Sequence, residues 1–397
     1  MESRKELLKY LAPTSDAPLN FEVSHAKGVH IYSPDGSSCV DLISGIAVAN
    51  TGHAHPKVIA AIQNQAERFT HVMVYGEYIQ SPQGEYAQAL VAMLPSSLNT
   101  VYFVNSGSEA VEGALKLAKR ATGRHEILAF KKAYHGSTHG ALSVMGDERL
   151  KQPYRPLLPG ITHAEFNNET ALDNITEKTA AVLVEPIQGE AGVIAPKDNF
   201  LAKLRSKCNE TGTLLLFDEI QTGFGRTGNI FALEKYKATP DILILAKSLG
   251  GGLPLGAFIA DHPLMEKLAL NPVLGHITTF GGHPLSCAAG KAALDVIIEE
   301  KLVEQVNEKG ALFKKLLQHK LIKELRGEGL FMAIQLESFD QAQAFMHLGV
   351  KLGFLTDWFL FCENAVRLAP PLIITKKEIE KVSEKILAAL DQIDTNS

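Results

Sequence analysis

Residues 214–228, LLLFDEIQTGFGRTG, and residues 240–256, PDILILAKSLGGGLPLG, contain the two polar side chains that decide the interpretation of this chain. An apolar run that begins at Leu214 leads into Asp218, and the apolar run ILIL is followed, after Ala246, by Lys247. Short runs of this kind are typical of buried parallel strands. Because the carboxyl ends of such strands form the ligand crevice of an open α/β sheet, we expect Asp218 and Lys247 to face one cavity.

The acid and the lysine have different chemical uses in such a cavity. A lysine flanked by apolar residues loses hydration, which disfavours the ammonium form and favours a nucleophilic amine. A carboxylate placed against a pyridine nitrogen keeps that nitrogen protonated, so that the ring accepts electrons when a substrate C–H bond breaks. The simpler alternatives are an Asp218 that caps a turn and a Lys247 that is solvated at the surface.

The glycines that follow the lysine, Gly250 to Gly252, allow the backbone to bend closely around a ligand. A dinucleotide-binding loop is the alternative, but the G-x-G-x-x-G pattern is not matched and no acidic residue follows at the required distance. The triple glycine therefore adds weight to a ligand site at Lys247.

Along the rest of the chain, short apolar runs alternate with helical patterns, which predicts an α/β fold with a mostly parallel sheet. A helix is expected over Glu109–Ala121, and from about Leu285 the pattern becomes long helix, then the strand-like run LFMAIQL, then a final helix after Thr375. The expected strands are Val101–Val104, Ile127–Phe130, Ala181–Val184, Leu214–Phe217, Ile242–Leu245 and Ala257–Ala260.

A phosphate pocket is predicted at residues 105–109, NSGSE, which follow one expected strand and open the next helix. Helix N-terminal amides bind anions, Gly107 allows close approach, and Ser106 or Ser108 adds a hydroxyl donor. The alternative for Ser108 is that it simply caps the helix.

The next expected strand leads into Tyr134, whose ring could stack on a planar ligand. His135 and His139 have the i, i+4 spacing of metal ligands, but Gly136 and Gly140 argue against a helix and no carboxylate accompanies them. We therefore predict no metal site.

Composition excludes several classes of protein. The 397 residues carry 39 basic and 44 acidic side chains, a net charge of −5, and contain no long basic run, which argues against nucleic-acid binding. No stretch reaches about 18 uncharged apolar residues, so we expect neither a membrane span nor secretion. The four cysteines are far apart and form no C-x-x-C pair, which fits a cytoplasmic location.

The order and spacing of several motifs resemble those of the class III aminotransferases, in particular the acetylornithine, ornithine and 4-aminobutyrate aminotransferases. The resemblance spans nearly the whole chain and implies a pyridoxal 5'-phosphate (PLP) enzyme of fold type I that forms homodimers with shared active sites. The change of pattern near residue 285 indicates a second, smaller domain, so we expect a segment 1–50 that packs with the small domain, a large PLP-binding domain over 51–285 and a smaller α+β C-terminal domain over 286–397. The motifs are GHAHPKV (52–58), NSGSEA (105–110), EPIQGEAGV (185–193), TTFGGHPLSCA (278–288), VRLAPPLIIT (366–375) and the two stretches quoted first.

The resemblance also implies roles for the residues that match the family motifs. Lys247 is the expected Schiff-base lysine, Asp218 the partner of the pyridinium nitrogen, and Gln221 the group near the 3-oxygen of the cofactor. Gly107 and Ser108 match the phosphate-binding turn.

Four further residues match positions that the family uses for stacking, for the dimer and for substrate. Tyr134 corresponds to the stacking aromatic residue, and Thr279 to a phosphate ligand that the neighbouring subunit contributes. Glu190 and Arg367 correspond to a pair that separates to admit the carboxylate of a 2-oxo acid. An arginine binds a carboxylate bidentately, and a nearby glutamate masks its charge when an ω-amino substrate is bound. The alternative is an ordinary structural salt bridge.

Two positions depart from the ornithine-type enzymes. Ser137 stands where these enzymes carry an arginine that grips the distal carboxylate of the donor, and Ile46 stands where they have a tyrosine. The nearby cations Arg149, Lys151 and Arg155 are the residues whose charge could replace that arginine.

We therefore expect a cytoplasmic, homodimeric aminotransferase that takes the terminal amine of a donor such as N-acetylornithine, with 2-oxoglutarate as the 2-oxo acid acceptor. The alternatives are an ω-amino acid or diamine aminotransferase, one that accepts pyruvate among them, and an aminomutase on the same scaffold, which needs no separate acceptor. A cofactor-free binding protein would have no need of both Lys247 and Asp218.

Overall fold

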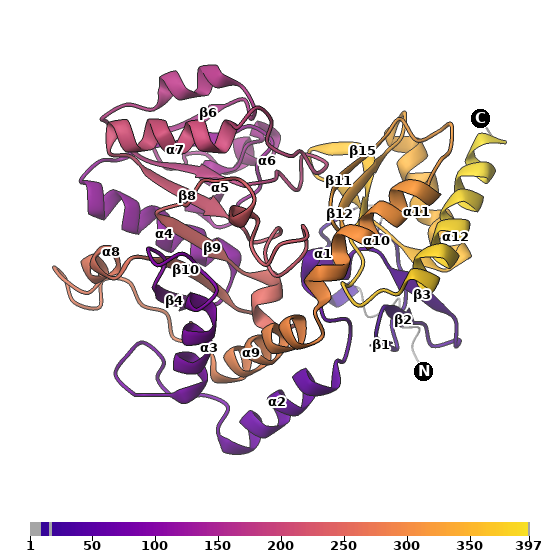
Figure 1. The fold of residues 1–397 in the computed structure, drawn as a ribbon, viewed down its shortest axis with the longest axis horizontal. Helices are drawn as coiled ribbons and strands as arrows, with labels where there is room; N and C mark the ends of the chain where they lie inside the picture. The colour runs from indigo at the N-terminus through magenta and orange to yellow at the C-terminus, as the bar shows by residue number, and fades with distance from the viewer. Residues whose placement is uncertain (1–8, 16–17, 396–397) are drawn as a thin grey trace.

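The computed structural model describes residues 9–15 and 18–395, and it contains three sheets. The largest sheet lies in the left part of Figure 1, and two four-stranded sheets lie with the C-terminal helices in the right part. The described residues include no helix that is both long and apolar enough to cross a membrane.

The seven-stranded sheet has the order β4-β10-β9-β8-β7-β5-β6. Strands β9, β8, β7, β5 and β6 run parallel, whereas β10 is antiparallel to both of its neighbours, β4 and β9. This confirms the predicted α/β class with a mostly parallel sheet. The strands are β4 (Thr100–Val104), β5 (Glu126–Phe130), β6 (Ile161–Ala164), β7 (Thr179–Val184), β8 (Leu214–Asp218), β9 (Ile242–Leu245) and β10 (Gly256–Ala260).

All six strands expected from the sequence lie within these observed strands, and only β6 was missed. Its sequence, ITHA, contains two polar residues, and the strand pairs on one side only, with β5. An edge strand of this kind does not produce the continuous apolar run that marks a strand buried on both faces.

Helix α4 (Gly107–Thr122) follows β4 and covers one face of the sheet. Its apolar side, which includes Val111 and Leu115, is buried against sheet residues such as Phe258. Gly113 is required at this contact, since an added Cβ would lie 2.3 Å from the Phe258 ring. The helix ends at Gly123, whose left-handed conformation (φ 69°) suits a C-terminal cap.

The long helical pattern after Leu285 forms two helices, α9 (Pro284–Glu299) and α10 (Leu302–Leu316), rather than one. The chain turns at Lys301, which adopts a left-handed φ of 50°. Apolar periodicity continues across this break because both helices bury one side, so the sequence pattern did not reveal it.

The two smaller sheets join the ends of the chain. One has the order β1-β2-β3-β13, in which β13 pairs in parallel with β3 near the N-terminus, and the other has the antiparallel order β11-β12-β15-β14. The expected strand LFMAIQL contains β12, and the final helix, α12, begins after Thr375 as predicted. The strands are β1 (His25–Lys27), β2 (His30–Tyr32), β3 (Ser38–Asp41), β11 (Glu324–Glu328), β12 (Phe331–Gln335), β13 (Phe354–Leu355), β14 (Trp358–Phe359) and β15 (Cys362–Leu368).

The remaining helices surround these sheets. The α-helices are α1 (Ser44–Ala47), α2 (Pro56–Arg68), α3 (Ser81–Val91), α5 (His139–Val144), α6 (Glu148–Lys151), α7 (Phe200–Thr211), α8 (His262–Met265), α11 (Phe339–Leu352) and α12 (Lys376–Asp394). Short 3-10 helices are η2 (Gln152–Tyr154), η3 (Glu169–Asn174), η4 (Ala232–Glu234), η5 (Lys247–Gly250) and η6 (Glu266–Leu268).

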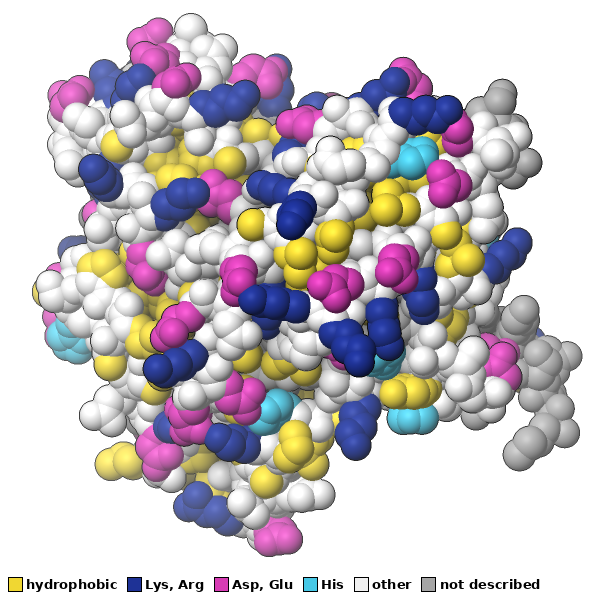
Figure 2. Space-filling model, turned by 45° about the vertical axis from the view of Figure 1, so that its right-hand side comes forward, with side chains coloured by type: hydrophobic (Ala, Val, Ile, Leu, Met, Phe, Trp, Pro, Cys, Tyr) yellow, Lys and Arg dark blue, Asp and Glu magenta, His cyan; other side chains and the backbone are white. Residues whose placement is uncertain are grey.

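The surface shown in Figure 2 carries basic and acidic side chains that are interspersed, with apolar side chains between them.

Candidate active site

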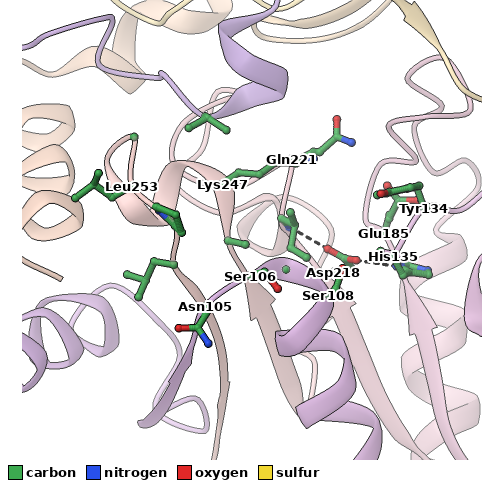
Figure 3. A pocket seen from close by; sticks show the side chains of 18 residues that line it. Asn105, Ser106, Ser108, Tyr134, His135, Glu185, Asp218, Gln221, Lys247 and Leu253 are labelled. Carbon is green, nitrogen blue, oxygen red and sulfur yellow. Dashed lines mark hydrogen bonds and ion pairs between the residues drawn. The ribbon is translucent and has the colours of Figure 1, made fainter. Parts of the chain in front are cut away.

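A cavity of about 410 Å³ lies where β8 and β9 end and α4 begins. This is the crevice at the carboxyl ends of strands that the sequence predicted. Figure 3 shows the side chains that line it. The lining residues are Val48, Asn105, Ser106, Gly107, Ser108, Tyr134, His135, Gly136, Glu185, Asp218, Ile220, Gln221, Ala246, Lys247, Gly252, Leu253, Pro254 and Leu255.

Asp218 is the last residue of β8 and is buried at the floor of the cavity. Its Oδ2 lies 2.7 Å from Nδ1 of the fully buried His135, and Figure 3 shows the two side chains pointing toward each other. Its Oδ1 accepts a hydrogen bond of 3.0 Å from the amide of Ile220. Asp218 therefore caps the turn that follows it, as the simpler interpretation proposed, and also presents a histidine-supported carboxylate to the cavity.

Lys247 begins η5 immediately after β9 and lines the same cavity. Burial lowers the pKa of Lys247 to about 8, while Glu190 opposes the shift and Arg367 adds to it. Its backbone is left-handed (φ 53°), a conformation that costs a residue other than glycine about 1 kcal/mol. The surrounding fold thus holds this lysine in a strained, half-buried position in the cavity, which does not match the alternative of a freely solvated surface lysine.

The start of α4 settles which serine caps the helix. Ser106 Oγ accepts a hydrogen bond of 3.2 Å from the Glu109 amide, so Ser106 is the N-cap residue. Ser108 does not cap the helix and lines the cavity instead, where its Oγ accepts a long hydrogen bond of 3.3 Å from the Ser137 amide. Gly107 leaves room for the Ile220 side chain at this turn, because an added Cβ would lie 2.8 Å from Cδ1 of Ile220 and would displace it.

Glu190 and Arg367 form a buried ion pair with 3.0 Å between Oε1 and Nη2. Gln221 joins the two, since its Nε2 donates to Glu190 Oε1 at 2.9 Å and its Oε1 accepts from Arg367 Nη1 at 3.2 Å. Although burial opposes the shift, Arg367 lowers the pKa of Glu190. The pair that the sequence predicted is therefore formed, and Gln221 contacts this pair as well as the cavity.

Two cavity residues were not assigned a role in the site from the sequence. His135, which was considered only as a metal ligand, is the partner of Asp218. Glu185 is fully buried, and its two oxygens accept from the amides of Gly189 (3.1 Å) and Tyr134 (3.3 Å). Burial, together with the nearby Asp218, raises the pKa of Glu185 well above its usual range. Glu185 opens the motif EPIQGEAGV, which was the available signal, but its contact with Tyr134 joins segments 51 residues apart.

Several residues named from the sequence lie elsewhere. Thr279 is exposed, in the segment before α9, and does not line the cavity of its own chain. Ser137 is exposed at the rim, where its Oγ is 3.3 Å from the Tyr134 hydroxyl. Ile46 is partly exposed in the short α1 turn and adopts a left-handed φ of 64°.

The nearby cations are paired with acids of their own loop. Arg149 bonds to Asp147 at 2.9 Å, and Arg155 and Lys151 both pair with Glu148. None of the three cations is among the residues that line the cavity. The described residues therefore offer no direct contact by which one of these cations would take the place of the arginine absent at position 137.

Comparisons with known proteins show the family of the whole chain. The family model of the class-III aminotransferases matches residues 10–390. The chain belongs to the class-III aminotransferases. It is therefore a transaminase, and the predicted fold type I is confirmed.

Among its relatives is the acetylornithine aminotransferase of Methanopyrus kandleri, which is 41% identical over 367 residues, 92% of each chain. The acetylornithine aminotransferase of Halalkalibacterium halodurans is 37% identical, with 98% of this chain and 100% of that protein covered. Among solved structures, an ornithine aminotransferase from Toxoplasma gondii superimposes with a TM-score of 0.91 at 30% identity and covers 99% of this chain and 94% of that one.

The cofactor of this family is PLP, and the cavity fits that group. Nε2 of His135 is buried and has no hydrogen-bond partner among the residues that the structure describes, so its ring nitrogen is available toward a ligand. The lowered pKa of Lys247 suits attack on an aldehyde, and the carboxylate of Asp218 suits a pyridinium nitrogen.

Proposed function

We propose that this aminotransferase moves the amino group of a terminal amine such as N-acetylornithine to a 2-oxo acid, with 2-oxoglutarate as the acceptor. The observation that carries the proposal is that Lys247 lies close enough to the buried Glu190–Arg367 pair for both charges to influence its pKa. The names of the relatives from Methanopyrus kandleri and Halalkalibacterium halodurans support the choice of donor.

The residues of the chain divide the chemistry between them. Bound PLP supplies an electron sink for the C–H bond that breaks. Asp218, held by His135, places a negative charge where the ring nitrogen must keep its proton. Nζ of Lys247, when neutral, accepts the proton that leaves the substrate carbon and returns it later in the reaction.

Glu190 and Arg367 allow one cavity to serve two kinds of substrate. While they are paired at 3.0 Å, the guanidinium is masked and an uncharged part of the donor lies against it. When Glu190 moves away, Arg367 offers its hydrogen-bond fork to the carboxylate of the 2-oxo acid. The pair therefore has a functional role beyond an ordinary structural salt bridge.

The test is a panel of donors and acceptors in separate half-reactions. N-acetylornithine, ornithine, 4-aminobutyrate and a simple diamine are each mixed with the PLP form, and 2-oxoglutarate and pyruvate with the aminated form. We expect the highest kcat/KM for N-acetylornithine and 2-oxoglutarate. Repeated turnover of a donor into an isomeric amine without any acceptor would indicate an aminomutase and contradict the proposal.

A second candidate is an aminotransferase for diamines or other ω-amines that lack a distal carboxylate, and the rim of the cavity favours it. Ser137 offers no charge there, and Arg149, Lys151 and Arg155 are engaged by neighbouring acids. Losing a charged partner for a carboxylate in a dry site typically costs about 2–5 kcal/mol, enough to reverse a preference between charged and neutral donors.

The variant Ser137→Arg tests this candidate. We expect it to shift selectivity toward donors with a distal carboxylate, measured as kcat/KM for donors matched with and without that group. If the natural protein already prefers the carboxylate-bearing donor by about a hundredfold, or about 2.7 kcal/mol, then another cation binds that carboxylate and the candidate is wrong.

We also propose a homodimer in which Thr279 of one copy completes the phosphate site of the other. Thr279 is exposed and lies outside its own cavity. Its neighbour Phe280 is an exposed aromatic residue, 52% accessible, packed on the ring of His71, and such a surface suits an interface.

Mixed dimers test this arrangement. Lys247→Ala and Thr279→Ala subunits are each expected to be poorly active alone, and a mixture should regain activity because one of the two sites in a mixed dimer carries neither defect. A monomer in light scattering, or no recovery on mixing, would contradict the shared site.

We propose the domain division 1–50, 51–285 and 286–397 and a cytoplasmic location. The pairing of β3 with β13 supports the packing of the N-terminal segment with the small domain, although residues 1–8 and 16–17 lie outside the described residues. The four free cysteines support a reducing compartment. Limited proteolysis near residue 285 and cell fractionation test these two points.

A further inference from the structure

All three guanidinium nitrogens of Arg367 donate a hydrogen bond to a side chain. Nη2 donates to Glu190 at 3.0 Å, Nη1 to Gln221 at 3.2 Å, and Nε to Oδ1 of Asp357 at 2.9 Å. The ring of Phe359 lies 4.5 Å from the guanidinium carbon. Arg367 therefore has a second carboxylate, Asp357, in addition to Glu190.

The partners belong to different parts of the fold. Glu190 and Gln221 come from the segments that follow β7 and β8, and they are bonded to each other. Asp357 lies between β13 and β14, and its carbonyl accepts from the Arg367 amide at 2.8 Å. Next to it, Thr356 Oγ1 donates to the Arg367 carbonyl at 2.6 Å. Asp357 is thus tied to the backbone of the arginine that it holds.

A carboxylate that enters the site must bind Nη1 and Nη2 of Arg367, because these are the two nitrogens that become free when Glu190 and Gln221 move away. The arginine has a long flexible stem, and its charge draws it toward Glu190 when that side chain moves. A bidentate bond to the entering carboxylate requires the guanidinium plane to stay in place. The Nε contact to Asp357 is the one charged contact here that does not have to break.

We propose that Asp357 is a positioning residue for the acceptor: it holds Arg367 by Nε while Glu190 leaves, so that the Nη1 and Nη2 edge faces the carboxylate of the 2-oxo acid. The inference rests on the proposed function, because it needs Arg367 to bind that carboxylate. It extends that function by assigning a separate role to a carboxylate on the β13–β14 turn.

The experiment compares Asp357→Ala and Asp357→Asn with the wild-type holoenzyme in the two half-reactions. Alanine removes the acceptor of the Nε hydrogen bond, so the KM for 2-oxoglutarate should rise about ten- to hundredfold. The donor half-reaction, in which Glu190 still holds Arg367, should change by no more than about twofold. Asparagine keeps an oxygen for Nε and should restore the acceptor KM to within about threefold of wild type.

The control variant is Glu363→Ala, a carboxylate that is exposed on β15 and has no contact with Arg367. It should leave both half-reactions unchanged. Binding of glutarate, an unreactive dicarboxylate, to the PLP form gives a second measurement that does not depend on turnover and should weaken in parallel with the acceptor KM.

The inference is wrong if Asp357→Ala leaves the acceptor KM within about twofold of wild type, lowers it, or raises the donor and acceptor KM equally. If the alanine variant does not fold, an Asp357→Asn variant that loses tenfold or more in glutarate binding overturns it. A wild-type protein with no donor half-reaction would instead contradict the proposed function.

Discussion

Replacing His135 by alanine tests whether the buried histidine supports Asp218. Its Nδ1 lies 2.7 Å from Asp218 Oδ2, and both side chains are buried. In the variant, the carboxylate keeps only the 3.0 Å bond from the Ile220 amide. We expect a carboxylate that is less well placed toward the cofactor nitrogen and a slower C–H cleavage step.

The size of the effect follows from the bond that is lost. A hydrogen bond to a charged group contributes about 1.5–3 kcal/mol. Because each 1.36 kcal/mol is a factor of ten in rate, kcat/KM should fall about 10- to 160-fold if the whole contribution is expressed in the transition state. Removing the imidazole also deletes the unpartnered Nε2, so affinity for PLP should fall as well.

The assay is the donor half-reaction under single-turnover conditions at saturating PLP, with His139→Ala as the control. His139 is exposed at the start of α5, four residues away, and does not line the cavity. The control should retain wild-type rates. If His135→Ala reacts within about threefold of wild type, the histidine does not support Asp218 and this reasoning is refuted.

Three further predictions concern the lysine and the aspartate. Lys247→Ala should lose both turnover and the covalent attachment of PLP, which borohydride trapping and peptide mapping detect. If the variant still attaches PLP covalently at the lysine that the wild-type protein uses, Lys247 is wrongly assigned. Asp218→Asn should keep PLP bound and slow amino transfer by several orders of magnitude, since a neutral amide does not hold the ring nitrogen protonated, and a near-normal rate would exclude this role. The Lys247 amine is protonated below its pKa of about 8 and neutral above it. The rate at which cofactor-free protein takes up PLP should therefore rise with pH up to about 8 and then level off. A flat profile from pH 6 to 9 would contradict the lowered pKa.

Much of the site could be predicted because strand ends are visible in the sequence. Asp218 and Lys247 each follow a run of residues buried on both faces, and the structure places both in the cavity at the ends of β8 and β9. The start of α4 was predicted for the same reason, since NSGSE follows β4 directly. In each case the residue and the element that positions it are neighbours in the chain.

Contacts between distant segments had no such signal. His135 meets Asp218 across 83 residues, and Glu190 meets Arg367 across 177 residues. A histidine or aspartate has the same local pattern whether it faces solvent or a buried partner. Only the packing of the elements shows which polar groups share a desolvated space.

The sequence by itself therefore determined the α/β class, the order of the strands along the chain and the residues presented at their ends, because apolar runs and the groups that follow them are local properties. The tertiary structure alone decided that Gln221 joins Glu190 and Arg367 and that His135 is the partner of Asp218. These outcomes depend on which hydrogen-bond and charge partners are within reach once water is excluded, and that competition is settled only when the chain is folded.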